Sequence, residues 1–465
     1  MARLDELIVV ARRHASAGEL RARHQLASLL DLRGEHCEAL ELLDRTEDGA
    51  GGAVASSAPA AHLLRGLVAR HAAFQATRAQ HLAHPAAGKD LMAVDVVDAA
   101  TLSLADFRAQ YLEPGRPCVL RGNGAAVPAW TPEELCTRLG SREVPLRRRS
   151  NSSASWARLE LAGSSPFDDF AKKYVLERGR IRAKPDEPQL FDFSIWQHCA
   201  DVLADEVVMP KWFCVDLFSL ASARIQPVAG SASPTLFLAA GGTCSSLHVD
   251  FLQTHFWMML CSGRKRWRLV PREELALLYP RYLTDLNPVF PFCLDEAESG
   301  TFPKDRFPAF SRLTVQEVVL EPGDIIFVPH GCPHQVENVE TSVAISANFI
   351  DASNVSAARS EASLLGLVHE DPALMAATLH EAEVSGELRR LEASAPEEHL
   401  PLREFKARHG ELRQPQETQR TVMSIVAAAV VIALGGIVAV ALRMRTSYKE
   451  LGVISVDSAE IPSDS

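Results

Sequence analysis

Two stretches of this sequence decide its fold: residues 242–271, GTCSSLHVDFLQTHFWMMLCSGRKRWRLVP, and residues 321–349, EPGDIIFVPHGCPHQVENVETSVAISANF. Both consist of short apolar and β-branched segments separated by Gly, Pro and Asn residues, a pattern that is typical of strands bounded by turns. Between residues 233 and 350 we expect strands at TLFLAA, SLHVDF, HFWMMLC, KRWRLV, EVVLE, DIIFVP and SVAISANFI. Their close spacing predicts an antiparallel β sandwich or barrel.

The segment SSLHVDF contains a candidate pair of metal ligands. Side chains two residues apart on a strand point to the same face, so His248 and Asp250 are expected to lie side by side. A third ligand must come from an adjacent strand, and EPGDIIFVPHGCPHQVENV offers His334 after a Gly-Pro loop. Two imidazoles and a carboxylate on one side of a metal leave coordination positions open. That arrangement suits non-haem Fe(II), which must bind a chelating cosubstrate and O₂ together.

Zinc hydrolysis is the main chemical alternative for these three residues. No fourth ligand and no HExxH motif accompanies them in the sequence, which disfavours it. Two other histidines lie nearby, because His255 begins the next expected strand and His330 lies on the turn before His334. We expect both to be surface residues or supporting residues rather than ligands.

A chelating cosubstrate such as 2-oxoglutarate also needs an anchor. It binds iron through its 2-oxo acid end, and its distal carboxylate then requires a buried cation and hydrogen-bond donors. Lys265, in the segment CSGRKRWRLVP, follows the ligand strand after a short return and is placed to project into the barrel. Its neighbours Arg264 and Arg266 alternate to the other face, and a solvated charge cluster is the alternative interpretation of all three. Hydroxyl groups are available nearby from Ser245 and Ser346.

The two stretches resemble the JmjC-domain family of 2-oxoglutarate oxygenases. The first is similar to the family's HxD motif followed by a strand and G-x-K-x-W, and the second to its P-x-G-x-x-H followed by a Val-x-Asn turn. The similarity extends upstream through DFRAQYLEPGRPCVLRG and LFDFSIWQHCADVLADEVVMPKWFCVDLF, so that it covers residues 95–352. The resemblance implies an α+β chain with a mainly β core, a double-stranded β-helix of the cupin or jelly-roll kind flanked by N- and C-terminal helices.

The resemblance also implies a site and a reaction. Iron would be held by His248, Asp250 and His334, and 2-oxoglutarate by Lys265 with help from the hydroxyl of Ser245 or Ser346. The implied reaction consumes 2-oxoglutarate and O₂, releases succinate and CO₂, and hydroxylates a protein or peptide side chain. Demethylation of N-methyl-lysine and a metal-binding module without turnover are the alternatives.

Met258 departs from the family pattern. Many members carry Asn in the strand after the HxD motif, where it positions cosubstrate or substrate, and this chain has Met258 there. The departure bears on turnover and substrate geometry, and it leaves iron binding untouched.

The composition of the chain excludes other classes of protein. The formal net charge is −11, and the basic run Arg147-Arg148-Arg149 is too short for a nucleic-acid footprint, so no nucleic-acid partner is expected. The nine cysteines are scattered without a CxxC pair, which disfavours a disulfide framework or a zinc ribbon. Nothing in the pattern predicts an oligomeric state.

Regions outside the expected catalytic domain have helical or membrane-like patterns. Residues 1–90 are rich in Ala, Leu, Arg and His with helical periodicity, including a possible helical hairpin around Gly34, and residues 353–420 read as helices and a spacer. Residues 421–442 carry no charge and would span about 33 Å as a helix, enough to cross a bilayer. With the short polar tail 443–465, this stretch predicts a single-pass tail anchor with the catalytic domain facing the cytosol.

Overall fold

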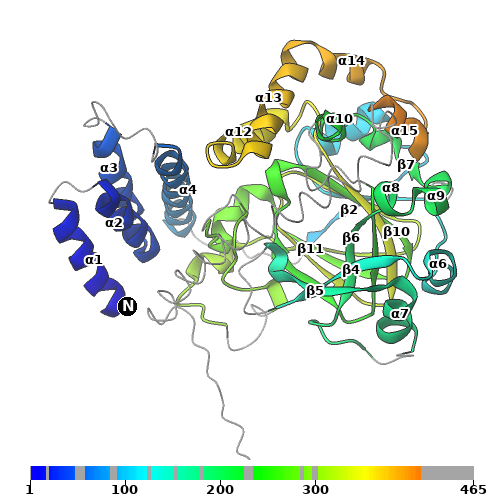
Figure 1. Cartoon of the computed structure of the whole chain (residues 1–465), viewed down its shortest axis with the longest axis horizontal. Coiled ribbons are helices and arrows are strands. Elements are labelled where there is room, and N and C mark those ends of the chain that lie inside the picture. Colours follow the sequence, from blue (N-terminus) through cyan, green and yellow to red (C-terminus); the bar gives the residue numbers. More distant parts are fainter. Residues whose placement is uncertain are drawn as a thin grey trace, which may run out of the picture. The chain divides into compact units, whose positions relative to one another are not determined.

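The computed structural model describes residues 2–16, 20–47, 58–83, 92–122, 127–150, 156–177, 182–224, 234–282, 287–295 and 302–409 (Figure 1). These residues fall into two units, one within Met1–Ala69 and the other within Arg70–Glu411. Each unit has its own hydrophobic core.

The first unit consists of helices α1 (Ala2–Ser16), α2 (Leu20–Arg33), α3 (His36–Glu47) and the beginning of α4 (Ala58–Ala83). Its core contains apolar residues from all four helices, among them Ile8, Leu30, Leu43 and Val68. Gly34 links α2 to α3 with a φ of 94°, the left-handed conformation that commonly ends a helix. This is the turn around which the sequence suggested a helical hairpin.

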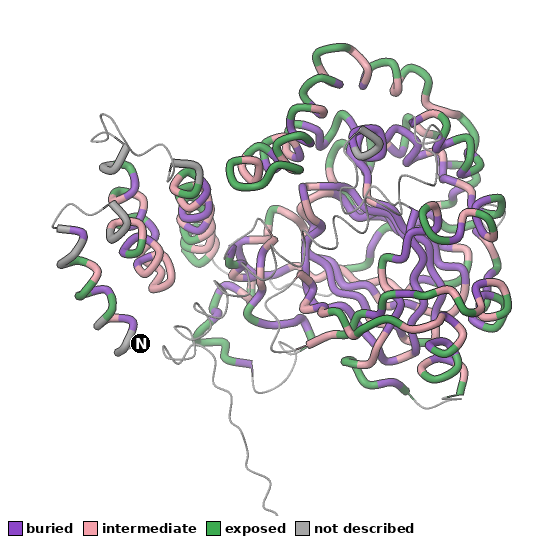
Figure 2. Tube along the Cα trace, viewed as in Figure 1, coloured by how far each residue is buried: buried purple, intermediate pink, exposed green. Residues whose placement is uncertain are grey.

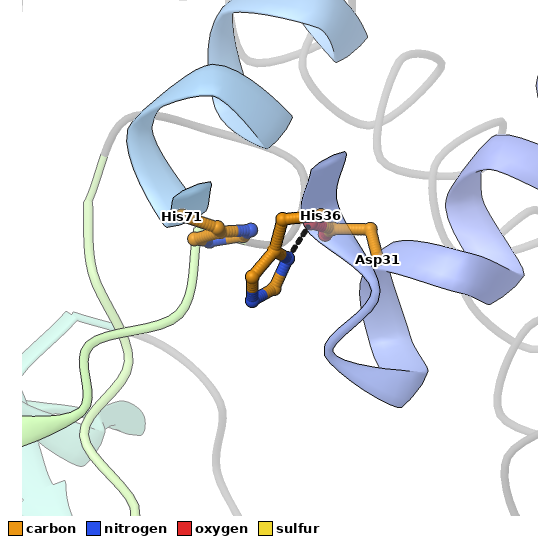
Figure 3. Close-up of side chains that lie close together, drawn as sticks. All are labelled: Asp31, His36 and His71. Atoms are coloured by element: carbon orange, nitrogen blue, oxygen red, sulfur yellow. Dashed lines mark hydrogen bonds and ion pairs between the residues drawn. The ribbon is translucent and has the colours of Figure 1, made fainter. Parts of the chain in front are cut away.

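A histidine–carboxylate pair lies at the turn between α2 and α3. The His36 Nδ1 and Asp31 Oδ1 atoms are 2.6 Å apart, as drawn in Figure 3. His71, which Figure 3 also labels, belongs to the second unit, where its Nε2 accepts a hydrogen bond from the backbone N–H of Tyr282 at 2.9 Å. Both interactions are explained by local packing of helices and loops.

Two sheets form the centre of the second unit. The smaller has the order β1-β12-β11-β14-β9 and the larger the order β2-β3-β13-β10-β15-β8-β6-β4-β5. The strands of the smaller sheet are β1 (Met92–Ala93), β9 (Cys244–His248), β11 (Lys265–Leu269), β12 (Gln316–Leu320) and β14 (His334–Asn338). Those of the larger sheet are β2 (Asp95–Asp98), β3 (Cys118–Arg121), β4 (Glu143–Arg149), β5 (Leu159–Pro166), β6 (Gln189–Ser194), β8 (Thr235–Ala239), β10 (His255–Ser262), β13 (Ile325–Val328) and β15 (Ser342–Phe349).

Most strands pair antiparallel, and the central ones are buried along their length (Figure 2). One face of the large sheet packs on a cluster rich in aromatic rings, in which Phe213 stacks on Trp257 at 5.7 Å between ring centroids. The other face contributes to a second cluster together with the small sheet, including Phe256, Met258 and Trp267. A cavity between strands of the two sheets opens beside this second cluster.

Short helices cover the first aromatic cluster: α5 (Leu104–Phe107), α6 (Pro132–Leu139), α7 (Phe167–Ala171), α8 (Ile195–His198) and α9 (Ala200–Leu203). A separate apolar cluster is shared by four helices: α10 (Leu217–Arg224), α12 (Val355–Leu365), α13 (Glu370–Val384) and α14 (Glu387–Ala393). Strands β7 (Val208–Met209) and β16 (Leu400–Pro401) form a two-stranded sheet, and helix α15 (Leu402–Arg408) follows β16. The fold is therefore a mixed α+β arrangement of two central sheets flanked by helices.

All the strands expected between residues 233 and 350 are present, and β14 was not among those expected. Its sequence HQVEN is polar at alternate positions and follows Gly and Pro, so it reads as a loop until its neighbours β9 and β11 are known. Within the described ranges no helix has the length and apolar character that a membrane crossing requires. The predicted span 421–442 lies outside those ranges.

Candidate metal centre and cavity

The three predicted ligands come together on neighbouring strands. His248 ends β9 and lies directly opposite His334 on β14, with 4.2 Å between the ring centroids. Asp250 lies just beyond β9, in extended backbone (φ −70°, ψ 147°) that keeps the alternation of a strand. The ligand atoms of all three lie within 4.8 Å of one another, and all three residues are buried. Strand β9 ends at His248, two residues before Asp250, so the expectation that both residues lie on one strand was wrong. Their side chains nevertheless approach the same point, as expected.

Backbone carbonyl groups orient both imidazoles. His248 Nδ1 lies 2.6 Å from the carbonyl oxygen of Ser246, and His334 Nδ1 lies 3.0 Å from that of Cys332. A carbonyl accepts a hydrogen bond, so Nδ1 carries the proton in each ring and Nε2 keeps its lone pair for a metal. Burial lowers the pKa of His248 well below its usual value and that of His334 to about 4, which keeps both rings neutral.

The pKa of the Asp250 carboxyl group is shifted upward, in the opposite direction to the pKa values of the two histidines. Burial raises its pKa to about 7, a hydrogen bond from Asn348 lowers it, and the negative charge of Asp192 raises it further. A bound divalent cation would stabilise the ionised carboxylate and so resolve this cost. Neutral imidazoles, a carboxylate and a dry environment together fit Fe(II) as a facial triad.

The triad faces a cavity of about 400 Å³. Aromatic side chains form much of its wall, and Trp156 packs edge-on against His248 with 4.5 Å between ring centroids. The Trp156 Nε1 group donates to the carbonyl of Val249 at 2.8 Å, which fixes the indole beside the ligand strand. The lining also includes Arg147, Gln189, Phe191, Asp192, Phe237, Ser245, Met258, Lys265, Asn287, Asn338 and Asn348.

Lys265 projects into the cavity from β11 and is 4% exposed. Its Nζ donates to Asn338 Oδ1 at 2.6 Å, and none of the described carboxylates lies within ion-pair distance of it. Burial lowers the pKa of Lys265 to about 7. On β14, Asn338 is four residues from His334, about 13 Å of strand, and Lys265 pairs with Asn338. A lysine side chain and a short dicarboxylate can bridge that separation, so the residues fit 2-oxoglutarate.

The two serines that the sequence selected lie differently. Ser245 lines the cavity from β9. Ser346 is buried opposite Met258 on the pair β10–β15, its Oγ lies 3.2 Å from the Thr235 hydroxyl, and it is not among the residues that line the cavity. Met258 itself does line the cavity, in the strand where the family pattern led us to expect Asn.

His255 and His330 lie outside the cavity, as expected of supporting residues. The His330 backbone N–H donates to His255 Nδ1 at 3.0 Å, and the His255 Nε2 lies 2.8 Å from the Ser353 hydroxyl. The His330 ring lies against the Arg272 guanidinium at 2.6 Å. These contacts hold the loop before His334 against β10 and Arg272, and they join β10 to the turn that precedes α12.

Sequence reasoning missed four residues of the site. Asn338 belongs to the Val-x-Asn turn that had been noted without a role, and Asn348 lies two positions after Ser346 on the same face of β15. Trp156 and Asp192 come from segments remote in sequence from the ligands, and no motif marked them. Their place follows from the packing of β4, β5 and β6 alongside the small sheet.

The chain matches the cupin-like domain over residues 104–354, which is more than half of its 465 residues. The chain belongs to the cupin-like domain family. The match contains every residue of the triad and Lys265, and it overlaps the catalytic domain expected at 95–352.

Several curated proteins are similar to this cupin-like chain. It is 34% identical over 121 residues to an arginine-specific demethylase, JMJ20, of Arabidopsis thaliana, a match that covers 26% of this chain and 24% of the relative. It is 29% identical over 274 residues to the 2-oxoglutarate and iron-dependent oxygenase JMJD4 of Gallus gallus, covering 56% and 61%. It is 25% identical over 273 residues to the bifunctional arginine demethylase and lysyl-hydroxylase psr-1 of Caenorhabditis elegans, covering 56% and 62%.

The chain spans less than two thirds of the length of each of these relatives. The name of the Gallus gallus protein includes 2-oxoglutarate and iron, the cosubstrate and the metal that the sequence predicted. The cupin-like domain of this chain has the three buried ligands that would hold the iron.

Proposed function

We propose that this chain is an Fe(II)- and 2-oxoglutarate-dependent oxygenase of the JmjC type that hydroxylates a side chain of a protein or peptide. The observation that carries the proposal is that the buried group His248, Asp250 and His334 and the buried ammonium of Lys265 face one cavity. A metal site alone suits many reactions, but a metal site with a buried cation at this separation suits a chelating dicarboxylate. We take the two sheets to form a double-stranded β-helix around this cavity.

The residues have distinct parts in this proposal. His248 and His334 present their Nε2 atoms, because both Nδ1 atoms are engaged with carbonyl groups. Lys265 binds the distal carboxylate of 2-oxoglutarate, and Ser245 offers a hydroxyl beside it. With O₂, the bound iron and 2-oxoglutarate supply an oxidant for a substrate C–H bond, and 2-oxoglutarate leaves as succinate and CO₂. The aromatic wall around Trp156 excludes water from that bond.

Succinate formation tests the proposal directly. The full chain is incubated with Fe(II), ascorbate, 2-oxoglutarate and peptide libraries, alongside His248→Ala and His369→Ala. His369 is exposed and distant in sequence from the ligands, so it is a matched histidine control. We expect the wild type and His369→Ala to form succinate and His248→Ala to form none. If the wild type binds metal and forms no succinate, the domain is a binding module.

N-demethylation is a second candidate because two of the relatives are named as arginine demethylases. Hydroxylation of an N-methyl carbon gives an unstable product that releases formaldehyde, whereas hydroxylation of a side-chain carbon gives a stable product of +16 Da. Proteins from cells that express the wild-type chain are compared by mass spectrometry with proteins from cells that express the His248→Ala or His334→Ala variant. This comparison separates N-demethylation from side-chain hydroxylation. Formaldehyde without a stable +16 Da product contradicts side-chain hydroxylation.

We also propose that residues 421–442 anchor the chain in a membrane with the cupin-like domain in the cytosol. The uncharged, apolar composition of this stretch supports the proposal. Alkaline carbonate should leave the full chain in the membrane pellet and release a chain that ends at Arg420. Protease added outside sealed vesicles should digest the cupin-like domain, and protection of the domain contradicts the orientation.

A further inference from the structure

Trp267 is a buried residue of the cavity wall that carries an unused hydrogen-bond donor. It ends the G-x-K-x-W motif on β11 and is 1% exposed. Its side chain lines the cavity, while its indole Nε1 is buried and has no hydrogen-bond partner among the described residues. An N–H group that leaves water without gaining an acceptor destabilises the folded chain, so a group of this kind indicates a missing partner.

Two other tryptophans provide a comparison. Among the described residues, three buried indole N–H groups lack an acceptor, those of Trp212, Trp257 and Trp267. Trp212 and Trp257 belong to the first aromatic cluster and do not line the cavity. Trp156 lines the cavity, but its N–H donates to the carbonyl of Val249 at 2.8 Å. Within the described part of the chain, only Trp267 combines an unpaired indole N–H with a place in the cavity wall.

The position of Trp267 is between the metal ligands and Lys265. Lys265 precedes it by two residues on the same face of β11, about 7 Å along the strand. Its partner on β14, Val336, lies midway between His334 and Asn338. The Trp267 ring also stacks on the His334 imidazole, with 5.5 Å between the ring centroids. A dicarboxylate that extends from the metal to Lys265 would therefore pass along this indole.

The carboxylate that Lys265 would bind has acceptor positions for more than one donor group. A carboxylate has about four lone-pair sites, and the Lys265 ammonium already donates one of its N–H groups to Asn338 Oδ1 at 2.6 Å. The Asn338 amide adds no donor, because its Nδ2 donates to the carbonyl and the hydroxyl of Thr243. Ser346, which the sequence suggested as a source of a hydroxyl, does not line the cavity. The indole N–H of Trp267 is available for this carboxylate.

We propose that the indole N–H of Trp267 donates a hydrogen bond to the distal carboxylate of 2-oxoglutarate, as a second donor beside the ammonium of Lys265. The proposal rests on the proposed oxygenase function, and it adds a residue to the cosubstrate site. The Trp267 ring packs on a metal ligand, and its N–H completes the anchor at the other end of the cosubstrate. Binding would give the buried donor an acceptor, so the N–H group would contribute to affinity as well as to orientation.

Packing alone is the alternative explanation of Trp267. Its ring belongs to the second cluster together with Phe256 and Met258, and the N–H would be left unpaired by that packing, as it is in Trp257. The two explanations differ in one observable property. A residue that only packs keeps the environment of its N–H group when the cosubstrate binds, whereas a donor gains an acceptor.

Indole N–H resonances measure this gain without turnover. The full chain is labelled with ¹⁵N-tryptophan, which gives one indole signal for each of its six tryptophans, and is loaded with Zn(II) as a diamagnetic metal. Trp267→Phe and Trp257→Phe assign two of the signals. On addition of 2-oxoglutarate, we expect the Trp267 proton signal to move downfield and the Trp257 signal to stay. 2-Oxobutyrate, which has the 2-oxo acid end and no distal carboxylate, should leave both signals in place.

The dissociation constant for 2-oxoglutarate measures how much the donor contributes. Calorimetry on the Zn(II)-loaded chain should show a Kd about 10-fold or more higher for Trp267→Phe, as for the loss of a hydrogen bond to a charged group. Trp257→Phe is the matched control, because it removes the same atoms from a buried, unpaired indole outside the cavity lining. Its Kd should stay within about 2-fold of the wild-type value.

Several results would overturn the role of Trp267. A Trp267 signal that stays in place while the wild type binds 2-oxoglutarate would show that packing keeps the N–H group sealed. A signal that also moves with 2-oxobutyrate would place the acceptor at the 2-oxo acid end. An equal rise in Kd for Trp267→Phe and Trp257→Phe would assign the effect to lost packing.

The same measurements separate this proposal from the oxygenase function. If the metal-loaded wild type does not bind 2-oxoglutarate at all, the oxygenase function is contradicted, and the role of Trp267 is contradicted with it. If 2-oxoglutarate binds and the Trp267 signal stays, only the role of Trp267 is contradicted. Should Trp267→Phe not fold, the wild-type signals still decide, because substitutions at the other tryptophans assign the Trp267 signal by elimination.

Discussion

The metal end of the cavity and the wall that carries Asp192 both contain a shift in strand register, but they differ in backbone conformation. At the metal end, the adjacent strands β9 and β14 of the small sheet place His248 opposite His334, with a register shift between His334 and Val336. Asp250 follows in extended backbone. At the wall, β6 has a bulge with a left-handed residue, and Trp156 precedes the left-handed residues Ala157 and Arg158. Extended backbone thus positions the carboxylate ligand, whereas left-handed backbone lies at or beside the residues of the wall. Substitutions at the two ends should have separable effects.

The largest expected effect is at the metal end. His334→Ala removes one of the triad's ligands, and we expect metal-dependent succinate formation to fall by more than about 100-fold, because losses of that size already follow changes to groups that only support ligands. Metal content per chain, measured by atomic emission, should fall in parallel. His369→Ala should retain both. Normal metal content in His334→Ala would contradict the triad.

Lys265→Met tests whether Lys265 binds the distal carboxylate of 2-oxoglutarate, at some distance from the metal. The variant keeps the length of the side chain and removes a charged hydrogen bond, so the KM for 2-oxoglutarate should rise by roughly 10- to 150-fold. Metal content should not change. Arg266→Gln is the matched control, because Arg266 is on the same strand and pairs with Glu337 at 2.8 Å on the other face. An equal rise in both variants would mean that Lys265 is only part of a surface charge cluster.

The same lysine predicts a pH dependence. Burial lowers its pKa to about 7, so in the absence of ligand it is charged below that pH and neutral above it. The KM for 2-oxoglutarate should therefore be constant below pH 7 and rise by up to about 10-fold per pH unit above it. Titration of the wild type and Lys265→Met from pH 6 to about 8.5 measures this, and the variant should lack the rise. The same slope in Lys265→Met would assign the dependence to another group.

The smallest effect is expected at Asn338, which holds Lys265. Its Oδ1 accepts from Lys265 Nζ at 2.6 Å and from the Ser342 hydroxyl at 2.8 Å, and its Nδ2 donates to the Thr243 hydroxyl at 2.8 Å. Asn338→Ala leaves these buried groups without that partner, so the free energy of unfolding should fall by about 1–3 kcal/mol. Denaturant titration measures the loss. A loss of the same size in Asn287→Ala, another asparagine that lines the cavity, would show that the effect is not specific to this network.

The sequence predicted the metal end better than the wall because strand periodicity and turn residues are local signals. His248, Asp250, His334 and Lys265 could each be placed from alternation and motif spacing, although Asp250 lies just beyond its strand. Ser346 was selected by the same rule, but the structure turns its hydroxyl toward Thr235. Alternation gives the face of a strand and not the neighbour that a side chain meets there.

Asp192 and Trp156 could not have been predicted in this way. Their positions depend on a bulge and on left-handed backbone, neither of which has a sequence signal as strong as Gly or Pro at these positions. Strand β14 was missed for a related reason, since its polar sequence becomes a strand only through pairing with β9 and β11. The sequence alone therefore did not predict which distant strands pair, nor where bulges interrupt that pairing.

The register that places His248 opposite His334 also has a consequence for folding. The two residues are far apart in the chain and meet only when β9 and β14 have paired, so the ligand set exists in the native state and is absent from the unfolded chain. A metal that binds only the native state adds RT ln(1 + [M]/Kd) to the free energy of unfolding, about 2.7 kcal/mol at a hundredfold excess over Kd. Iron binding would then stabilise the folded chain as well as supply its chemistry, so the chain without metal should unfold more readily.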